Sequence, residues 1–551
     1  MVANQNIASL LQVQASLQPE VVAIADPRYA PMTFAELADA VCQTTAVLRQ
    51  LGLQSGQAAL VFQPMSVELY VLLLALFRLG IVAMFVDPSA GRSHLEQCCI
   101  LYPPDALIAS AKAHLLRLRS PILQKIPVKI AIGDLPVLGA RRWSLARQTR
   151  LAQQTRLAQQ TRLAQQTRLS FTTAPDLAVS SQTPALLTFT SGSTGSPKAA
   201  LRTHGFLLAQ HRSLCQSLHL TPGEINLATL PIFVLANLAS GVTTLIPNVD
   251  LRFPGKVNAA KVMAQIQTHQ PQSTAASPAF LSRLADYCES QDLLLSSFQK
   301  IFSGGAPVFP PLLERLQRLA PQAKVSAVYG STEAEPIAHI SCDAVLSADV
   351  AAMSNGAGLL VGVPVPDIQL RILPDRWGEA LAPFTMAEFN FSCLPAGAPG
   401  EIVVSGDHVL SGYLHDRGNA ETKFQVAGQI WHRTGDAGYL DSQGRLWLLG
   451  RCNARTTDEK GTLYPFAVEV AASFVANIRR TAFVGYAGRR ILVVELAKGD
   501  RHFHHAHLEG LKQSLVRPIQ EYRILSVIPI DKRHNAKVDY LTLSKTLKIN
   551  K

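Results

Sequence analysis

The sequence predicts an α/β protein with a large N-terminal domain of layered α/β sheets, which includes a β-rich subdomain, and a small α+β C-terminal domain. Apolar strands alternate with helical stretches through about residue 340, which favours largely parallel sheets. Short apolar segments with turn signals then follow between residues 358 and 450. A chain of 551 residues also exceeds what one hydrophobic core usually serves, so we expect at least two domains.

The N-terminal domain is expected at residues 1–451. Its helices are predicted at 66–79 and after His204, and its strands at 57–63, 81–86, 129–133, 185–191, 225–231, 300–305 and 324–330. The apolar stretch 67–86 is the strongest candidate for a membrane span. Because it contains Glu68, Arg78 and Gly80, we interpret it as a buried helix, a glycine stop and a buried strand, with no stable span.

The β-rich subdomain is expected at 358–450, and the C-terminal domain at 452–551 after a connection near Gly450 and Arg451. Apolar segments predict the strands of the subdomain at 358–373, 400–406 and 444–450. Four further apolar segments supply the elements of the C-terminal domain, at 468–474, 479–486, 491–497 and 522–530.

Residues 145–169 repeat every six residues, a period that matches neither a coiled coil nor a solenoid. Leucines six apart step around a helix by about 240°, so they form no single stripe. We expect a tandem expansion in a surface connection, either disordered or a loose helix, without a catalytic role. A basic docking arm is the alternative.

The formal net charge of +12 is only weak evidence for nucleic-acid binding, because five arginines lie in this repeat with no acid among them. We therefore expect no nucleic-acid partner. The eight cysteines show no CxxC spacing, which is typical of thiols in a reducing compartment. No basic and apolar signal opens the sequence, so a cytoplasmic protein is expected.

The stretch TSGSTGSPK, residues 190–198, follows an apolar strand and combines hydroxyls and glycines with one lysine. Such a loop offers backbone N–H groups and a cation to an anion. It is not a Walker loop, because Lys198 follows Pro197 and precedes Ala199. From these residues alone, phosphate binding and a plain loop both remain open.

Further motifs follow in order along the chain: SGGAP at 303–307, YGSTE at 329–333, HRTGDAGYLD at 432–441, GRLWLLGR at 444–451, and RHNAK at 533–537. Together with the loop, they make nearly the whole chain resemble the adenylate-forming superfamily of acyl-CoA synthetases, luciferases and nonribosomal peptide adenylation domains. This resemblance implies activation of a small carboxylic acid by ATP with release of pyrophosphate. It also implies that the C-terminal domain is a mobile lid.

The resemblance assigns residues to the nucleotide. The loop would hold the β and γ phosphates of ATP through Thr190, Ser191, Gly192, Ser193, Thr194, Gly195 and Lys198. A backbone wall beside the adenine would be formed by Gly304, Gly305 and Ala306. Tyr329 would pack on the adenine, and Asp436 would accept hydrogen bonds from both ribose hydroxyls. Arg451 would contact the ribose just before the hinge.

The catalytic residues implied in the same way are Thr332, Glu333 and Lys537. Thr332 would contact the α-phosphate, and Glu333 would hold Mg²⁺, a cation that prefers oxygen ligands. Lys537 would bridge the substrate carboxylate and the α-phosphate. Taken singly, a core tyrosine, a turn aspartate and a surface arginine are the plain alternatives for Tyr329, Asp436 and Arg451.

Three positions depart from the common pattern of acyl-CoA synthetases. Val234 stands where a histidine is common, Asn453 stands at the hinge, and Arg533-His534-Asn535 precedes Lys537. These departures resemble the branch of β-lactone synthetases of long-chain olefin biosynthesis, whose members are often labelled fatty-acid CoA ligases. In that branch the β-hydroxyl of the substrate attacks its own adenylate and AMP leaves. A long-chain fatty acid–CoA ligase, which would require CoA, is the alternative.

Two other classes of protein stay open. A non-catalytic nucleotide-binding homologue is disfavoured by the presence of Glu333, Asp436 and Lys537, and loading of a carrier domain is disfavoured by the lack of a clear carrier segment. Fatty acyl substrates and pathway enzymes are the expected partners. HFHHAH at 502–507 is interpreted as a solvated surface rather than a metal clip, and His204 as either an acyl-pocket residue or a packed helix start.

Overall fold

The computed structural model describes residues 5–87, 90–146, 179–191, 197–486, 488–497, 519–530 and 537–549. The chain divides into two compact units. Unit 1 comprises residues 1–247 and 412–418, and unit 2 comprises residues 248–411 and 419–551. Both units contain helices and sheets, which confirms the predicted α/β class. The predicted domain boundary after residue 451 stays a prediction.

Unit 1 contains a seven-stranded sheet in the order β7-β6-β5-β3-β4-β8-β9. All neighbouring strands are parallel except β8 and β9, which form an antiparallel hairpin. The strands are β3 (Ala58–Phe62), β4 (Val82–Phe85), β5 (Ala106–Ser110), β6 (Val128–Ile132), β7 (Arg141–Trp143), β8 (Pro184–Ser191) and β9 (Pro197–Thr203). The central strand β3 is buried along its whole length, because parallel strands are covered on both faces.

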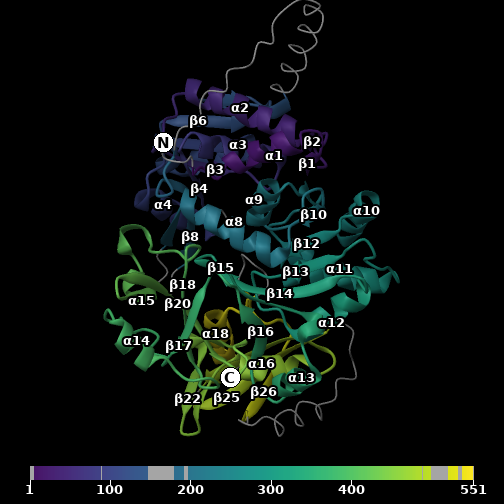
Figure 1. Cartoon of the computed structure of the whole chain (residues 1–551), viewed down its shortest axis with the longest axis vertical. Coiled ribbons are helices and arrows are strands. Elements are labelled where there is room, and N and C mark those ends of the chain that lie inside the picture. The colour runs from purple at the N-terminus through teal and green to yellow at the C-terminus, as the bar shows by residue number, and fades with distance from the viewer. Residues whose placement is uncertain are drawn as a thin grey trace, which may run out of the picture. The chain divides into compact units, whose positions relative to one another are not determined.

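Helices accompany these strands, as Figure 1 shows for α2 and α3 in the purple first part of the chain. The helices and 3₁₀ turns of unit 1 are α1 (Ser9–Leu17), α2 (Phe34–Gln50), α3 (Val67–Arg78), α4 (Arg92–Leu101), α5 (Ala111–His114), η2 (Leu115–Arg119), α6 (Pro121–Lys125), α8 (His204–Leu218), α9 (Pro231–Ser240) and η5 (Leu414–Asp416). Ser66 caps α3 by accepting from the Leu69 amide, and Gly80 follows with φ 64°. The predicted helix, glycine stop and strand are thus confirmed.

A second set of strands in unit 1 follows the order β10-β11-β1-β2. These strands are β1 (Val22–Ala25), β2 (Met32–Thr33), β10 (Ile225–Ala228) and β11 (Thr243–Leu245). Helix α9 precedes β11 and buries Val234 completely. Within the same layer, the Asn237 side chain donates to Asn226 Oδ1 at 3.1 Å, so a buried amide is satisfied.

Unit 2 is organised around the strands β17-β18-β20-β21-β16-β15-β14-β13-β12, with β19 paired to β20. Strands β12, β13 and β14 are parallel, and the pairs from β14 to β17 are antiparallel. Their bounds are β12 (Ser273–Ala276), β13 (Lys300–Ser303), β14 (Lys324–Ser331), β15 (Ala334–Ser341), β16 (Leu359–Pro364), β17 (Gln369–Leu373), β18 (Gly400–Ser405), β19 (Lys423–Val426), β20 (Gln429–Leu440) and β21 (Leu446–Arg451). Strands β16–β21 therefore form the expected β-rich region.

Helices of unit 2 flank this sheet in the order of the chain. They are η3 (Pro254–Lys256), α10 (Ala259–His269), α11 (Pro278–Ser290), α12 (Pro310–Leu319), η4 (Cys342–Ala344), α13 (Ser347–Ser354), α14 (Met386–Ser392) and α15 (Asn419–Thr422). Pro278 and Pro310 open α11 and α12 at the first helical position, where a missing N–H costs nothing.

The C-terminal part of unit 2 has an α+β arrangement around the sheet β24-β25-β26. Its elements are η6 (Cys452–Ala454), β22 (Thr456–Asp458), β23 (Gly461–Leu463), α16 (Phe466–Ser473), β24 (Ile478–Tyr486), β25 (Arg489–Leu496), β26 (Glu521–Leu525) and α18 (Tyr540–Ile549). Alternate residues of β24 and β25 point into two apolar clusters, one with α16 and one with α18. The sheet therefore packs against a helix on each face.

Two predicted features fall outside the described residues: the six-residue repeat from position 147 onward, and the histidine segment 502–507. Within the described part of the chain, no helix is long and apolar enough to cross a membrane.

Glu469 of α16 is a buried carboxyl whose protonation should make stability depend on pH. Its Oε1 accepts hydrogen bonds from the Tyr540 hydroxyl at 2.6 Å and the Phe483 amide at 2.8 Å. Burial raises the pKa of Glu469 to about 7, although these hydrogen bonds oppose the shift. The folded state therefore binds a proton more tightly than the unfolded state, so stability falls as the pH rises from about 4.5 to about 7.

We predict that Glu469→Gln removes this dependence. The difference in free energy of unfolding between wild type and variant should change by on the order of 3 kcal/mol across that pH window. Urea unfolding followed through the tyrosine-rich C-terminal part measures it, with the exposed Glu459→Gln as control. A difference that stays constant with pH would contradict the assigned protonation.

Candidate functional site

The adenine-wall residues and Tyr329 lie at neighbouring strand ends in unit 2. Gly304–Ala306 directly follow β13, and Tyr329 lies near the end of β14, which is parallel to β13. A Cβ at Gly304 would lie 3.0 Å from the Val328 carbonyl oxygen, so only glycine lets these two backbones approach. The carboxyl ends of parallel strands are where α/β proteins bind ligands. The structure thus brings together four residues that the motifs predicted.

The carboxylate of Asp436 joins Tyr329 to Arg451. The Tyr329 hydroxyl donates to Asp436 Oδ2 at 2.8 Å, and Arg451 Nε lies 3.2 Å from Oδ1. Asp436 and Arg451 are direct cross-strand partners on β20 and β21, and the side chain of Thr434 accepts from the Asp436 amide at 3.1 Å. One carboxylate therefore holds a tyrosine and an arginine from three different strands.

The protonation of this cluster follows from its surroundings. Burial and the adjacent Asp436 carboxylate raise the pKa of Tyr329 well above its ordinary value. The same carboxylate raises the pKa of Arg451. Tyr329 is therefore a neutral hydrogen-bond donor and Arg451 a permanent cation at neutral pH, so Asp436 has a donor on each oxygen.

A buried ion pair beside Asp436 was not assigned from the sequence. Arg433 donates to both oxygens of Glu401 through Nε, with the shortest contact at 2.6 Å from Nη2, and both side chains are almost completely buried. Arg433 also donates to the carbonyls of Arg376 and Glu379. It thereby ties the loop 374–379 to strand β20. The motif HRTGD contains Arg433, but the sequence does not indicate its distant partner.

Trp377 of this loop packs where Gly435 leaves space. The guanidinium of Arg433 lies 5.4 Å from the centre of the Trp377 ring, a cation–π distance. Gly435 has φ 70°, and a Cβ there would lie 2.9 Å from the ring. Glycine is therefore required both for its conformation and for the space, immediately before Asp436.

Thr332 and Glu333 form the turn between β14 and β15. Ser331 pairs with Ala334, and the Ser331 hydroxyl accepts from the Glu333 amide at 3.3 Å. The Glu333 carbonyl accepts from the Leu410 amide at 2.7 Å, which fixes the backbone of the turn. Thr332 is exposed and Glu333 half-buried, so both can meet a ligand.

Lys423 is a buried cation near Glu333 that motif analysis missed. It opens β19 with only 8% of its surface exposed, and its Nζ donates to the Leu410 carbonyl. Burial lowers the pKa of Lys423 to about 7, while the Glu333 carboxylate opposes the shift. Leu410 thus links the two residues, because its amide bonds Glu333 and its carbonyl bonds Lys423. No spacing in the sequence indicates this contact.

His432 pairs with Lys423 across β19 and β20. Burial, and then the charge of Lys423, lower the pKa of His432 to about 3, so its ring is neutral at physiological pH. Its Nδ1 lies 3.1 Å from the Thr422 carbonyl and therefore carries the hydrogen. Lys423 and Glu333 are consequently the ionisable pair of this region.

The predicted phosphate loop connects β8 to β9 in unit 1. Thr190 pairs with Lys198, and Ser191 with Pro197, so both lie at the tip of the hairpin. Gly192, Ser193, Thr194 and Gly195 lie outside the described residues. Their phosphate contacts stay predictions.

Lys198 lies in a tight contact with the segment 412–418. Its Nζ is 5.8 Å from the centre of the Tyr413 ring, and a side chain at position 418 would collide with the lysine. Only 9% of the Lys198 surface is exposed. This segment therefore positions the lysine at the base of the hairpin.

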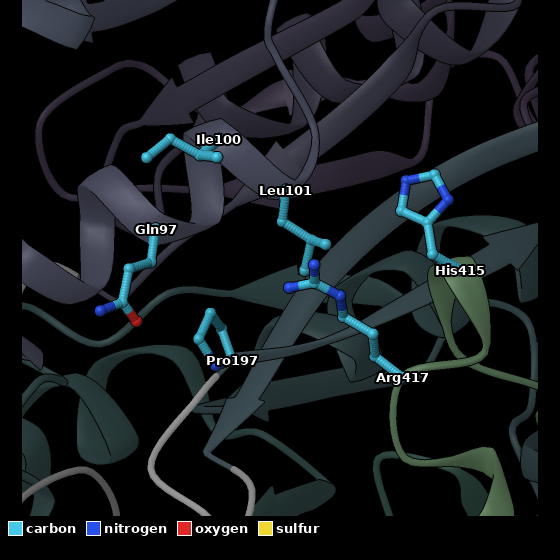
Figure 2. A pocket seen from close by; sticks show the side chains of 6 residues that line it. All are labelled: Gln97, Ile100, Leu101, Pro197, His415 and Arg417. Atoms are coloured by element: carbon cyan, nitrogen blue, oxygen red, sulfur yellow. The ribbon is translucent and has the colours of Figure 1, made fainter.

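A cavity of about 380 Å³ lies beside the same hairpin. Figure 2 shows its lining, which comes from helix α4, from Pro197 and from the segment 412–418. His415 and Arg417 supply its basic groups, and Leu101 and Ile100 its apolar ones. The cavity thus reaches the last residue before Lys198.

The remaining predicted residues are placed without a settled role. Lys537 is half-buried and directly precedes Val538, which bridges to Ile530. Asn453 of η6 lines a cavity of about 370 Å³ in the C-terminal part. His204 is fully buried at the start of α8, where its Nδ1 accepts from the Ile7 amide at 3.3 Å. Its packed helix-start interpretation therefore matches the structure.

No group of three or more His, Cys, Asp and Glu side chains that could hold a metal ion occurs among the described residues. Glu333 is the carboxylate that the motif assigns to Mg²⁺. Magnesium is commonly bound by one or two carboxylates together with substrate phosphates and water, so a single Glu fits that mode.

Comparison with known proteins supports the motif analysis. Residues 11–414 match the model of the AMP-binding enzyme family. The chain is 30% identical to the olefin beta-lactone synthetase of Stenotrophomonas maltophilia over 90% of this chain and 87% of the relative. It is also 30% identical to that of Xanthomonas campestris, over 97% and 96%. The predicted resemblance, including its branch, is confirmed.

More distant relatives include a 2-succinylbenzoate–CoA ligase of Enterococcus faecalis, which is 25% identical over 82% of this chain and 80% of the relative. Among solved structures, ATP-bound MatB from Rhodopseudomonas palustris aligns over 100% of both chains with a TM-score of 0.77 and 20% identity. That likeness concerns the fold.

The contact between Gly435 and Trp377 predicts a selective penalty. Gly435→Ala should be less stable than wild type by about 1–2 kcal/mol from its positive φ and by about 1–3 kcal/mol more from the clash with Trp377. Gly428→Ala, in the turn before β20, is the matched control, because it has φ 85° and open space. Urea midpoints measure both variants.

The clash has its own control. Adding Trp377→Ala should recover part of the loss in Gly435→Ala and none of the loss in Gly428→Ala. Equal penalties for the two glycine variants would show that Trp377 does not enforce the glycine.

Proposed function

The chain belongs to the family of AMP-binding enzymes, and from this premise we propose that it uses ATP to activate a fatty or 3-hydroxy fatty acid. The predicted class, an AMP-forming acid ligase, is confirmed by the family and by the relatives. The observation that carries the nucleotide site is the Tyr329–Asp436–Arg451 cluster beside Gly304–Ala306. We propose that ATP binds there.

The cluster supports a nucleoside in a specific way. Asp436 presents two carboxylate oxygens, each with a donor already oriented toward it. Ribose hydroxyls can replace or share these donors, because a carboxylate accepts up to four hydrogen bonds. Tyr329 lies at the strand end next to the glycine wall, where an adenine ring would lie flat against it.

The phosphates and Mg²⁺ are assigned to the hydroxyl-rich loop, Lys198, Thr332 and Glu333. Magnesium, when bound, neutralises phosphate charge and orients the triphosphate. Glu333 would be its protein ligand, and Lys423 supplies a second positive charge near that carboxylate. Lys537 would compensate charge that builds as the carboxylate attacks the α-phosphorus.

The first step joins a carboxylate oxygen to the α-phosphorus and breaks the bond to pyrophosphate. In the second step we propose that the β-hydroxyl oxygen attacks the activated carbonyl carbon. The bond to AMP then breaks, the hydroxyl proton leaves, and a β-lactone forms. This choice rests on Val234, Asn453 and Arg533-His534-Asn535, and on the two relatives that carry the name beta-lactone synthetase.

A fatty acid–CoA ligase is the second candidate, because a relative over most of the chain is named a CoA ligase. It would share the first step and replace the internal hydroxyl by the thiol of CoA. A non-catalytic nucleotide-binding homologue is disfavoured by the presence of Glu333, Asp436 and Lys537.

Removing the Asp436 carboxylate should weaken nucleotide binding. We expect Asp436→Ala to lose about 1.5–3 kcal/mol of ATP affinity, the range for hydrogen bonds to charged groups. Isothermal calorimetry measures it. Asp441→Ala is the control, because Asp441 lies in the same hairpin and bonds Arg445 and Trp447 instead. Equal ATP affinity in Asp436→Ala and wild type would remove Asp436 from the proposed site.

Product analysis tests the reaction itself. With ATP and Mg²⁺ but no CoA, 3-hydroxy fatty acids should give AMP, pyrophosphate and a β-lactone, while plain fatty acids should stop at the bound adenylate. Lys537→Ala should lower adenylate formation far more than ATP binding. Mass spectrometry of the products decides. CoA-dependent thioester formation without any lactone would replace the proposal by the ligase, and ADP production would overturn both.

A further inference from the structure

One edge of unit 1 exposes an unusual number of leucines. In the segments 115–119 and 134–142, which we call the leucine–arginine face, the most exposed are Leu118 at 77%, Leu135 at 68% and Leu138 at 96%. Leu115 is exposed to 60%. The face lies at the outer end of the seven-stranded sheet, where η2 adjoins the turn between β6 and the edge strand β7.

Hydrogen bonds join the two segments into one surface. Arg117 of η2 donates from Nη1 to the Leu138 carbonyl at 3.2 Å, so it links η2 directly to the β6–β7 turn. Arg142 donates to the Asp134 carbonyl at 3.3 Å and holds the other end of the turn. The exposed leucines are therefore presented by a braced backbone.

The same surface is strongly basic. Residues 111–142 contain seven Lys or Arg residues and one acid, Asp134. Arg119, Arg141 and Arg142 are exposed beside the leucines. A large share of the chain's formal charge of +12 thus gathers in a short stretch.

We propose that the leucine–arginine face docks the protein onto an anionic lipid bilayer. Exposed apolar side chains lower their free energy by entering the boundary between headgroups and acyl chains, and arginines beside them bind lipid phosphates. The two features fit one occupant, since a lipid surface offers apolar and anionic groups at the same depth. The docking is peripheral, and the inference does not rest on the proposed reaction.

Charge complementarity argues against other occupants. The six-residue repeat of this chain carries five arginines and no acid, and a second copy presents the same positive face, so each would add like charge. Nucleic acid would satisfy the arginines but leave Leu118 and Leu138 against phosphates and water. An anionic bilayer satisfies both.

Vesicle sedimentation with the full chain tests the proposal. Phosphatidylcholine vesicles that contain phosphatidylglycerol should bind the protein, while pure phosphatidylcholine vesicles should bind it at least about tenfold more weakly. Leu118→Ser/Leu138→Ser should abolish most of the binding. Arg119→Gln/Arg141→Gln should weaken it by about fivefold for each arginine.

Matched controls keep the test specific. Leu346→Ser/Phe391→Ser removes two leucine-like exposed groups from unit 2, at 57% and 94% exposure, and should bind as wild type does. Thermal unfolding verifies that each variant is folded. Equal binding to both kinds of vesicle, unchanged binding of the face variants, or loss of binding when residues 147–169 are deleted would overturn the proposal. Tighter binding to RNA than to anionic vesicles would do the same.

Discussion

The buried pair of Arg433 and Glu401 is the constraint on which the nucleotide site depends. Two charges without water cost much free energy unless hydrogen bonds satisfy both, and here each is satisfied. Arg433 uses Glu401 and two loop carbonyls, and burial together with Arg433 sets opposing shifts on the pKa of Glu401. Because Arg433 lies three residues before Asp436, this pair sets the position of the carboxylate.

From that anchor, the site forms by register alone. Strand β20 carries His432, Arg433, Thr434 and Asp436, and its partners β18, β19 and β21 each meet one of these residues. Glu401 contacts Arg433, Lys423 faces His432, and Arg451 faces Asp436. A slip of one residue would turn all these side chains to the opposite face.

Much of the fold could be predicted because strand and helix patterns are local. The helix after Ser66, the stop at Gly80 and the strand that follows depend on neighbours in sequence. The nucleotide motifs could likewise be recognised from their order. Their contacts could not: Tyr329 meets Asp436 across more than a hundred residues, and nothing local signals that distance.

Lys423 marks a second limit of prediction. A lysine is ordinarily exposed, so its sequence position gives no reason to expect burial. Its burial follows from a backbone carbonyl that accepts from it and from the nearby Glu333. Such a cation lowers the repulsion that a triphosphate would meet beside a carboxylate. The residue thus complements Glu333, although the two are far apart in sequence.

The segment 412–418 has a consequence for how the polypeptide can be divided. It belongs to unit 1 although its flanking residues on both sides belong to unit 2, so the chain passes between the units at 247–248, 411–412 and 418–419. A fragment that ended at Pro247 would lack Tyr413 and Gly418, and it would expose the Lys198 side chain that they cover. The two units are therefore interlaced as a thread is through cloth. Unit 1 is complete only after the ribosome has made most of unit 2.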